Sequence, residues 1–262
     1  MSLFINETGT PAAPTIIFLH GIGGAGWMWK PQLAHFNDYH CLIPDLPGHG
    51  KSHQEPWISL EATAAVIADL IRTRATKGQA HIVGLSLGAY IAAQLLSSEP
   101  DLVDHAILSG LCVLPLPRLW LMRVMGYVLV PLMRTRLFLR VNAKALHIPE
   151  EHYAEYQSVM RQMSRLAFLR ASNDAGTFRM PSNFGEVKQP TLVLAGEREH
   201  PLIIESTKVV TTTLPHAVGR LAPDVGHGWS GENPALFNAA SHAWINDLTL
   251  PHELLNLPGA AR

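Results

Sequence analysis

Short, strongly apolar segments recur along the chain, and each ends in small or turn-forming residues. A run of apolar residues without polar alternation is typical of a strand that is buried on both faces, as in a parallel sheet covered by helices. Such strands are predicted at residues 15–20, 39–44, 81–84, 106–109 and 191–196, with a weaker candidate at 216–223.

Helical patterns lie between these segments. Residues 60–72 follow Ser59, a candidate N-cap, and residues 87–97 begin directly after the third apolar run. A last helix is predicted at residues 234–248. Because strand and helix alternate, crossover connections join the strands, and such connections produce a parallel sheet. The chain is therefore predicted to have an α/β fold.

The alternation breaks at residues 111–184, which have a helical pattern throughout. Pro149 opens one long predicted helix that runs to about Arg170. We therefore expect an inserted helical unit in this region. The α/β core is then formed by residues 1–110 and 185–262.

Residues 111–133 are apolar enough to suggest a membrane span. They contain Arg118, Arg123 and three prolines, however. Each arginine would cost about 2.5–3.5 kcal/mol at the centre of a bilayer. We therefore expect a hydrophobic helical lid here and no membrane span.

Composition narrows the possible functions. The 262 residues include 20 basic and 21 acidic side chains, so no positive field favours a nucleic-acid partner. The 14 histidines are scattered without the spacing of a metal-binding motif such as HExxH, and neither a metal nor a cofactor is predicted. Cys41 and Cys112 lie in apolar segments, which favours reduced core thiols and a cytoplasmic location.

The segment Gly-Leu-Ser-Leu-Gly at residues 84–88 lies where a predicted buried strand ends and an apolar helix begins. A serine in so tight a turn needs glycine on both sides, because a Cβ there would clash with the neighbouring backbone. The turn lifts the hydroxyl of Ser86 clear of the sheet, and free N–H groups at the start of the helix favour negative charge beside it. Ser86 is therefore the candidate nucleophile. The alternative is a glycine-flanked turn with an incidental serine.

A serine hydroxyl needs a base to become an effective nucleophile, and His227 is the candidate. It lies between two glycines, after the last strand candidate and before the last helix. We therefore expect it on a loop at the same edge of the sheet as Ser86.

A glycine-rich loop at residues 21–26 follows the first predicted strand. Such a loop lets the backbone approach a substrate, and the N–H groups of Ile22 and Leu87 are predicted to form an oxyanion hole. The loop lacks both the GxGxxG spacing and the lysine of phosphate-binding loops, which argues against a nucleotide site.

Several of these features occur in one order along the chain. They are His20 and Gly21, the segment DLPGHGKS at residues 45–52, the GLSLG segment, and Gly226 and His227 followed by Glu232 and Pro234. Together they resemble the α/β-hydrolase superfamily. The resemblance implies a mostly parallel sheet of about eight strands flanked by helices, with residues 111–184 forming a helical cap over the active site.

The family also implies an acidic residue that orients the histidine. It is usually an aspartate, a few residues after the strand that corresponds to residues 191–196. Glu199 stands at that position here, and Glu197 is the alternative. The other place where family members carry this acid, after the strand at residues 106–109, offers none. Both glutamates could also be solvated loop charges.

With serine in the tight turn, the resemblance implies acyl transfer to water, because dehalogenases and epoxide hydrolases of this fold carry an aspartate there. We expect a carboxylesterase-like enzyme of class EC 3.1.1. It would act through an acyl-enzyme on an ester-type carbonyl of a small, largely apolar substrate. The apolar residues expected near the substrate are Trp27, Trp29, Trp120, Met122, Met125, Tyr127, Met160, Met163 and Phe168.

Other functions of the same residues remain open. The same three side chains could serve a C–C bond hydrolase, a perhydrolase or an acyltransferase. A ligand receptor of this fold that turns over slowly is an alternative of a different class.

Overall fold

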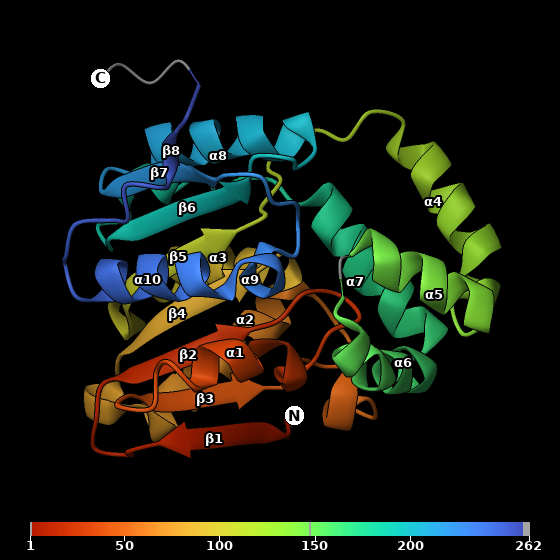
Figure 1. The fold of residues 1–262 in the computed structure, drawn as a ribbon, viewed down its shortest axis with the longest axis horizontal. Coiled ribbons are helices and arrows are strands. Elements are labelled where there is room, and N and C mark those ends of the chain that lie inside the picture. Colours follow the sequence, from red (N-terminus) through yellow and green to blue (C-terminus); the bar gives the residue numbers. More distant parts are fainter. Residues whose placement is uncertain (1, 147, 259–262) are drawn as a thin grey trace.

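The computed structural model describes residues 2–146 and 148–258, and its centre is a single eight-stranded sheet (Figure 1). The strands lie in the order β1-β3-β2-β4-β5-β6-β7-β8. Their bounds are β1 Ile5–Gly9, β2 Thr15–Leu19, β3 His40–Pro44, β4 Ala80–Leu85, β5 Val103–Ser109, β6 Thr191–Gly196, β7 Ala217–Ala222 and β8 Leu255–Asn256. Only the edge strands β1 and β8 pair in antiparallel fashion. The predicted mostly parallel sheet of about eight strands is thus confirmed.

Helices cover both faces of the sheet, because alternate residues of each buried strand point to opposite sides. In β2, Ile17 and Leu19 pack in the hydrophobic cluster of α2, α3 and α8, while Ile16 and Phe18 pack in the cluster of α10 on the other face. The bounds are α1 Lys30–Leu33, α2 Leu60–Arg74, α3 Leu87–Ser98, α8 Pro201–Thr213, α9 Trp229–Glu232 and α10 Pro234–Ile245. The two cysteines are buried and free, as predicted.

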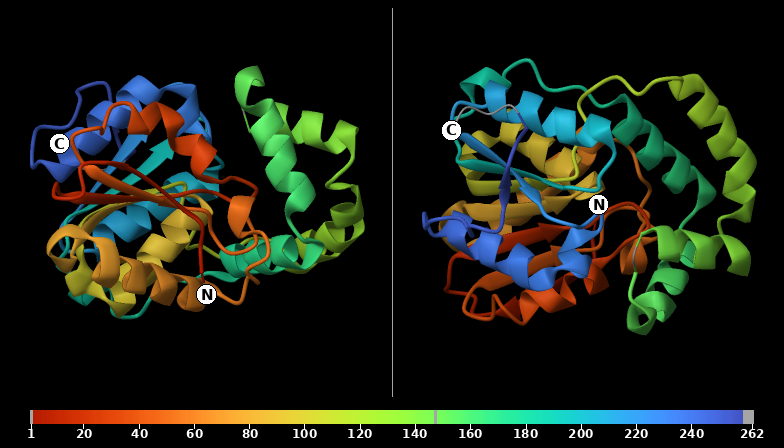
Figure 2. Two further views of the ribbon diagram at one scale, coloured as in Figure 1. Left: turned by 90° about the horizontal axis from the view of Figure 1, so that it is seen from below. Right: turned by 45° about the horizontal axis from the view of Figure 1, so that its top comes forward.

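Four helices of the inserted region lie between β5 and β6. They are α4 Leu119–Leu129, α5 Arg136–Ala145, α6 Tyr153–Gln162 and α7 Arg165–Thr177. Figures 1 and 2 show them gathered beside one end of the sheet, apart from the helices on its faces. The division of the chain into a core and a cap at residues 111–184 is our interpretation of this arrangement.

The single long helix predicted from Pro149 to about Arg170 is wrong. The chain leaves the helical conformation at Met163, and Ser164 begins a new helix by accepting the N–H of Ala167 at its hydroxyl. Serine is a strong N-cap at such a position, but the apolar pattern on either side of Ser164 masks this break in the sequence.

The cap and the core share one hydrophobic cluster, and polar contacts also join them. The indole N–H of Trp57 donates to Asp174 at 2.8 Å, and Lys30 pairs with Glu155 at 2.9 Å. In contrast, α4 leaves Trp120 and Tyr127 two-thirds exposed. Within residues 2–146 and 148–258, none of the helices combines the length and the apolarity needed to cross a bilayer.

The start of α3 lies against the backbone of the strands below it. A Cβ at Gly84 would be 2.5 Å from the carbonyl oxygen of Gly88, and a Cβ at Gly88 would be 2.0 Å from that of Leu19. Backbone atoms cannot move aside as a flexible side chain can. The two glycines of the GLSLG segment therefore allow the close approach that the sequence predicted.

We expect Gly88→Ala to lower the free energy of unfolding by about 3 kcal/mol, because the new methyl group overlaps the backbone of β2. Gly185→Ala is the matched control, since a Cβ there meets nothing within 4 Å. That change should stay within about 0.5 kcal/mol of the wild type. Urea unfolding of both variants is the measurement, and equal stabilities would contradict the close approach.

Candidate active site

Ser86 lies in the sharp turn between β4 and α3, with φ 54° and ψ −114°. A positive φ at a residue with a side chain is strained, so the surroundings must hold it. The Ser86 N–H donates to the carbonyl of Ser109 at 2.8 Å, and its own carbonyl accepts from Ala89 and Tyr90. The predicted strand–turn–helix context of the serine is confirmed.

The loop that follows β2 passes directly beside this serine. A Cβ at Gly21 would be 3.3 Å from the Cβ of Ser86 and 3.9 Å from its hydroxyl oxygen. The next residue, Ile22, lines the same cavity as Ser86. Leu87 is the first residue of α3, and an N–H at that position has no carbonyl partner within the helix. One of the two amides predicted for an oxyanion hole therefore belongs to the residue that follows Ser86, and the other to a residue that lines the same cavity.

His227 is paired with Glu199. Its Nδ1 lies 3.0 Å from Oε2 of Glu199. The two residues come from loops that follow the neighbouring parallel strands β7 and β6, whose carboxyl ends meet at one edge of the sheet. The carboxylate side chain is 1% exposed and the imidazole 35%.

Glu197 does not take part in this pair. It is exposed, and its Oε2 accepts the backbone N–H of Asp224 at 3.0 Å. Of the two glutamates considered from the sequence, the structure therefore brings Glu199 and not Glu197 to His227.

The environment of His227 raises its pKa. Burial alone would lower the pKa, but the hydrogen bond and the charge of Glu199, with a smaller contribution from Glu232, raise it above the ordinary 6.5. Because an ionised carboxylate can only accept, Nδ1 of the neutral ring carries the proton and Nε2 keeps its lone pair. The ring is thus a stronger base than a free imidazole.

Gly110 supplies the space in which this pair fits. Its φ is 71°, and a Cβ there would be 2.8 Å from Cε1 of His227 and 3.3 Å from Oε1 of Glu199. Gly110 directly follows β5, the strand beside the one that carries Ser86. The glycine was seen in the sequence only as a place without an acidic residue, and its contact with the imidazole was missed.

Ser86 and His227 line one cavity of about 420 Å³ between the core and the cap. From the core it is lined by Trp27 and Met28, and from the cap by Leu146, Ile148 and Phe168. An apolar cavity of this size with a few polar groups is typical of a small-molecule site.

The apolar residues expected at the substrate are distributed differently. Trp27 and Phe168 line the cavity as predicted, but Trp29 is fully buried, with its ring against Phe18 and Phe237 on one face of the sheet. Trp120, Met125 and Tyr127 are exposed on α4. Met160 and Met163 are buried in the hydrophobic cluster that the cap shares with the core, and the side chain of Met122 is outside the described part. Helical periodicity alone did not reveal that α4 contacts α7 and leaves most of its large apolar side chains exposed.

His20 and Asp45, which belong to the motifs noted in the sequence, hold the loops of the site together. Nδ1–H of the buried His20 donates to the carbonyl of Gly21 at 2.8 Å, and its Nε2 accepts the N–H of Leu46 at 3.0 Å. The bond accepted by Nε2 needs a neutral ring, and burial lowers the pKa of His20 to about 4. Asp45 accepts backbone N–H groups from Gly26 and Lys51 at 2.7 and 2.8 Å. These side chains join the glycine-rich loop to the loop after β3.

Residues 16–240 match the sequence profile of the family described as "Alpha/beta hydrolase family". The chain belongs to this family. A relative from Gibberella zeae, "AB hydrolase superfamily protein", is 28% identical to this α/β hydrolase over 94% of the chain and 84% of the relative. The "Putative carbamate hydrolase RutD" of Stutzerimonas stutzeri is 26% identical over 87% and 90%.

Among solved structures, the "Putative non-heme bromoperoxidase BpoC" of Mycobacterium tuberculosis superimposes on this α/β hydrolase with a TM-score of 0.77. The identity is 23%, over 95% of this chain and 97% of the other. At that identity the likeness concerns the fold.

We expect Glu199→Gln to lower the pKa of His227, because the neutral amide removes the charge that favours the imidazolium. Glu197→Gln, a change of the same kind on the same loop, should leave that pKa unchanged. The measurement is an NMR titration of the His227 ring signals in the wild type and both variants. A shift caused by Glu197→Gln but not by Glu199→Gln would assign the wrong glutamate to the histidine.

Proposed function

We propose that the protein is a serine hydrolase of the carboxylesterase type. It cleaves an ester-type carbonyl of a small, largely apolar substrate through an acyl-enzyme. The observation that carries this proposal is the placement of Ser86 and His227 on one cavity, with His227 hydrogen-bonded to Glu199 at 3.0 Å.

In the first half of the reaction, the hydroxyl oxygen of Ser86 attacks the carbonyl carbon while Nε2 of His227 takes the hydroxyl proton. Glu199 stabilises the imidazolium that forms. The carbonyl oxygen becomes an oxyanion, which the backbone N–H groups of Ile22 and Leu87 stabilise by hydrogen bonds. When the tetrahedral intermediate collapses, the alcohol leaves with the proton from His227.

In the second half, a water molecule attacks the acyl-enzyme. His227 takes a proton from the water and then returns it to the oxygen of Ser86, so that the acid is released and the enzyme restored. The raised pKa of His227 suits a group that must take up and release a proton in each half-reaction.

The cavity supports the expected substrate class. Its apolar side chains suit an aliphatic or aromatic acyl or alcohol group, and its volume of about 420 Å³ limits the size of that group. Polar atoms are contributed at the cap side by Asn142 and Tyr156, which are hydrogen-bonded to each other at 2.6 Å. The substrate therefore combines one reactive carbonyl with a compact, mostly apolar body.

The names of the relatives indicate which substrates to compare. Carbamate cleavage, as in the name of the Stutzerimonas stutzeri relative, also begins with attack on an sp² carbonyl. A perhydrolase would use the same acyl-enzyme but release it with hydrogen peroxide in place of water. Esters, carbamates and peroxide as acceptor can therefore be compared on one preparation.

We expect Ser86→Ala to abolish hydrolysis of short p-nitrophenyl esters, with a loss of at least about 1000-fold in kcat, because the nucleophile is gone. Labelling by a fluorophosphonate probe should disappear as well. Ser98→Ala is the matched control: Ser98 is an exposed serine at the end of α3 away from Ser86, and its loss should leave both labelling and turnover in place.

Two results would contradict the proposal. Undiminished turnover in Ser86→Ala would show that another group performs the reaction. Tight binding of a small ligand by a wild type whose turnover is no faster than that of Ser86→Ala would favour the receptor of the same fold.

A further inference from the structure

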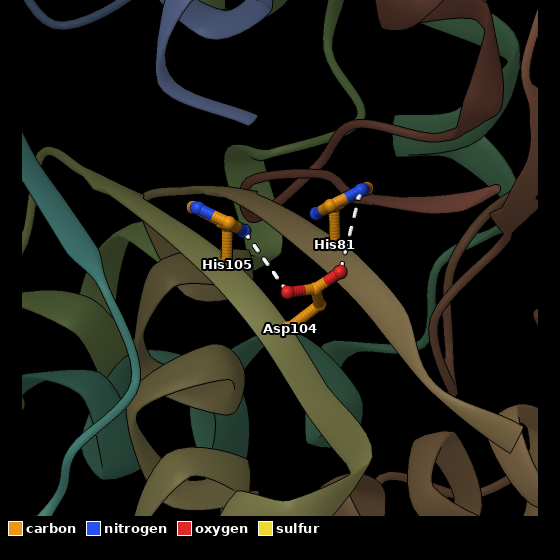
Figure 3. Close-up of side chains that lie close together, drawn as sticks. All are labelled: His81, Asp104 and His105. Atoms are coloured by element: carbon orange, nitrogen blue, oxygen red, sulfur yellow. Dashed lines mark hydrogen bonds and ion pairs between the residues drawn. The ribbon is translucent and has the colours of Figure 1, made fainter. Parts of the chain in front are cut away.

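A second group of ionisable side chains lies at the edge of the sheet opposite to Ser86. His81 is near the start of β4, and Asp104 and His105 are near the start of β5 (Figure 3). One ligand atom from each of the three residues lies within 4.8 Å of the others. Five residues of extended strand, about 17 Å, separate His81 from Ser86. The cluster therefore does not belong to the candidate active site.

An irregularity in the strand pairing brings the three side chains together. Ala80 pairs with Val103 and Ile82 pairs with Ala106, so His81 alone stands opposite both Asp104 and His105. Two residues opposite one is the pattern of a β-bulge, which redirects side chains and is often found next to functional sites. Motif spacing in the sequence could not reveal this group, because its members meet only through the pairing of β4 with β5.

The distances suit a small cation. Oδ1 of Asp104 lies 3.2 Å from Nδ1 of His105, and Oδ2 of Asp104 lies 3.8 Å from Nε2 of His81. Ligand atoms around a tetrahedral zinc ion are separated by about 3.4 Å. These two separations are close to that value, and one ligand atom of each residue lies within 4.8 Å of the others, so rotations of the side chains would place the three atoms around one ion.

The imidazole of His81 is buried and incompletely hydrogen-bonded. Its side chain is 8% exposed, and within the described residues its Nδ1 is buried without a hydrogen-bond partner. Leaving a polar atom buried and unpaired costs free energy, and a neutral ring always has one nitrogen lone pair to offer. A cation held beside Asp104 would use the lone pair of Nε2, the nitrogen that lies 3.8 Å from Oδ2 of Asp104, with the ring proton on Nδ1.

The other side of His105 has the arrangement typical of a metal ligand. Its Nε2 lies 3.2 Å from Oδ1 of Asp247, which follows α10. Histidines that bind metals commonly donate their second ring N–H to a carboxylate, which fixes the ring and makes the ligating nitrogen more basic. Asp247 has a φ of 54°, so the backbone there also adopts a special conformation beside His105.

We propose that His81, Asp104 and His105 bind one divalent transition-metal ion with the preferences of zinc. Two imidazoles and one carboxylate suit zinc, whereas calcium and magnesium prefer oxygen ligands. Asp104 is half exposed, and with His81 it lines a surface cavity of about 180 Å³, so the ion has an entry path and water completes its coordination. The ion would join β4, β5 and the segment after α10 at the edge away from the cavity.

The test is calorimetric titration of zinc into protein stripped with a chelator and returned to chelator-free buffer. We expect one equivalent bound by the wild type, and an unfolding temperature that rises with zinc concentration because the ion binds the folded state. His81→Ala and His105→Ala should lose this site. Asp247→Asn, which changes only the outer carboxylate, should weaken binding by about tenfold.

Two controls separate this site from other histidines. His252→Ala removes a ring that is 95% exposed, and His227→Ala removes the histidine of the candidate active site. Both should still bind one equivalent. Loss of binding in His227→Ala, or equal binding in the wild type, His81→Ala and His105→Ala, would overturn the proposal, as would an absence of stoichiometric binding to the wild type.

Because His81 is buried, His81→Ala could fail to fold. Asp104→Ala serves as the second variant, since its side chain is half exposed. We expect it to keep the far-ultraviolet circular dichroism of the wild type and to lose the zinc-dependent rise in unfolding temperature. Cobalt substitution adds a geometric readout: strong visible absorption of a tetrahedral site in the wild type, absent in Asp104→Ala. A folded Asp104→Ala that responds to zinc as the wild type does would refute the site.

Discussion

The hydrogen bond between His227 and Glu199 is one of several contacts between the loops after β7 and β6, and it is the one that holds the imidazole. Each loop follows its own strand, β7 or β6, and only the parallel pairing of those strands brings the loop starts to the same edge. A glutamate reaches one methylene further than an aspartate, so the imidazole needs more room beside the sheet. Gly110 supplies that room, because any side chain there would overlap the ring. The carboxylate of Glu199 and the absence of a side chain at Gly110 therefore both determine where the imidazole of His227 lies.

The parts of this protein that follow from local chemistry were predictable from the sequence. The strand at residues 191–196 coincides with β6, and the tight turn around Ser86 follows from its flanking glycines. The edge strands β1 and β8 were not predicted, since β1 is only half buried and lacks a continuous apolar run, and β8 is two residues long. Local sequence patterns therefore predict a strand that is buried on both faces well, and they predict an edge strand poorly.

Sequence patterns could not predict which side chains meet in the folded protein at the candidate active site and at His81. Glu197 and Glu199 are two residues apart on one loop, and only the fold shows that one is exposed while the other is buried against His227. Trp27 and Trp29 are likewise two residues apart, yet one lines the cavity and the other is core. The group at His81 depends on a single unpaired position between β4 and β5. In each case a shift of one or two residues changes the role, and spacing alone cannot resolve it.

The backbone conformation of Ser86 also affects the free energy of the folded chain. A glycine would adopt a φ of 54° without steric strain, whereas a serine held there raises the free energy of the folded chain by about 1–3 kcal/mol. This strained conformation stabilises neither β4 nor α3. Its effect is on geometry: the backbone conformation at Ser86 sets the direction in which the Cβ projects. The sheet and α3 hold the turn in this strained conformation, and the strain is released only when the turn unfolds.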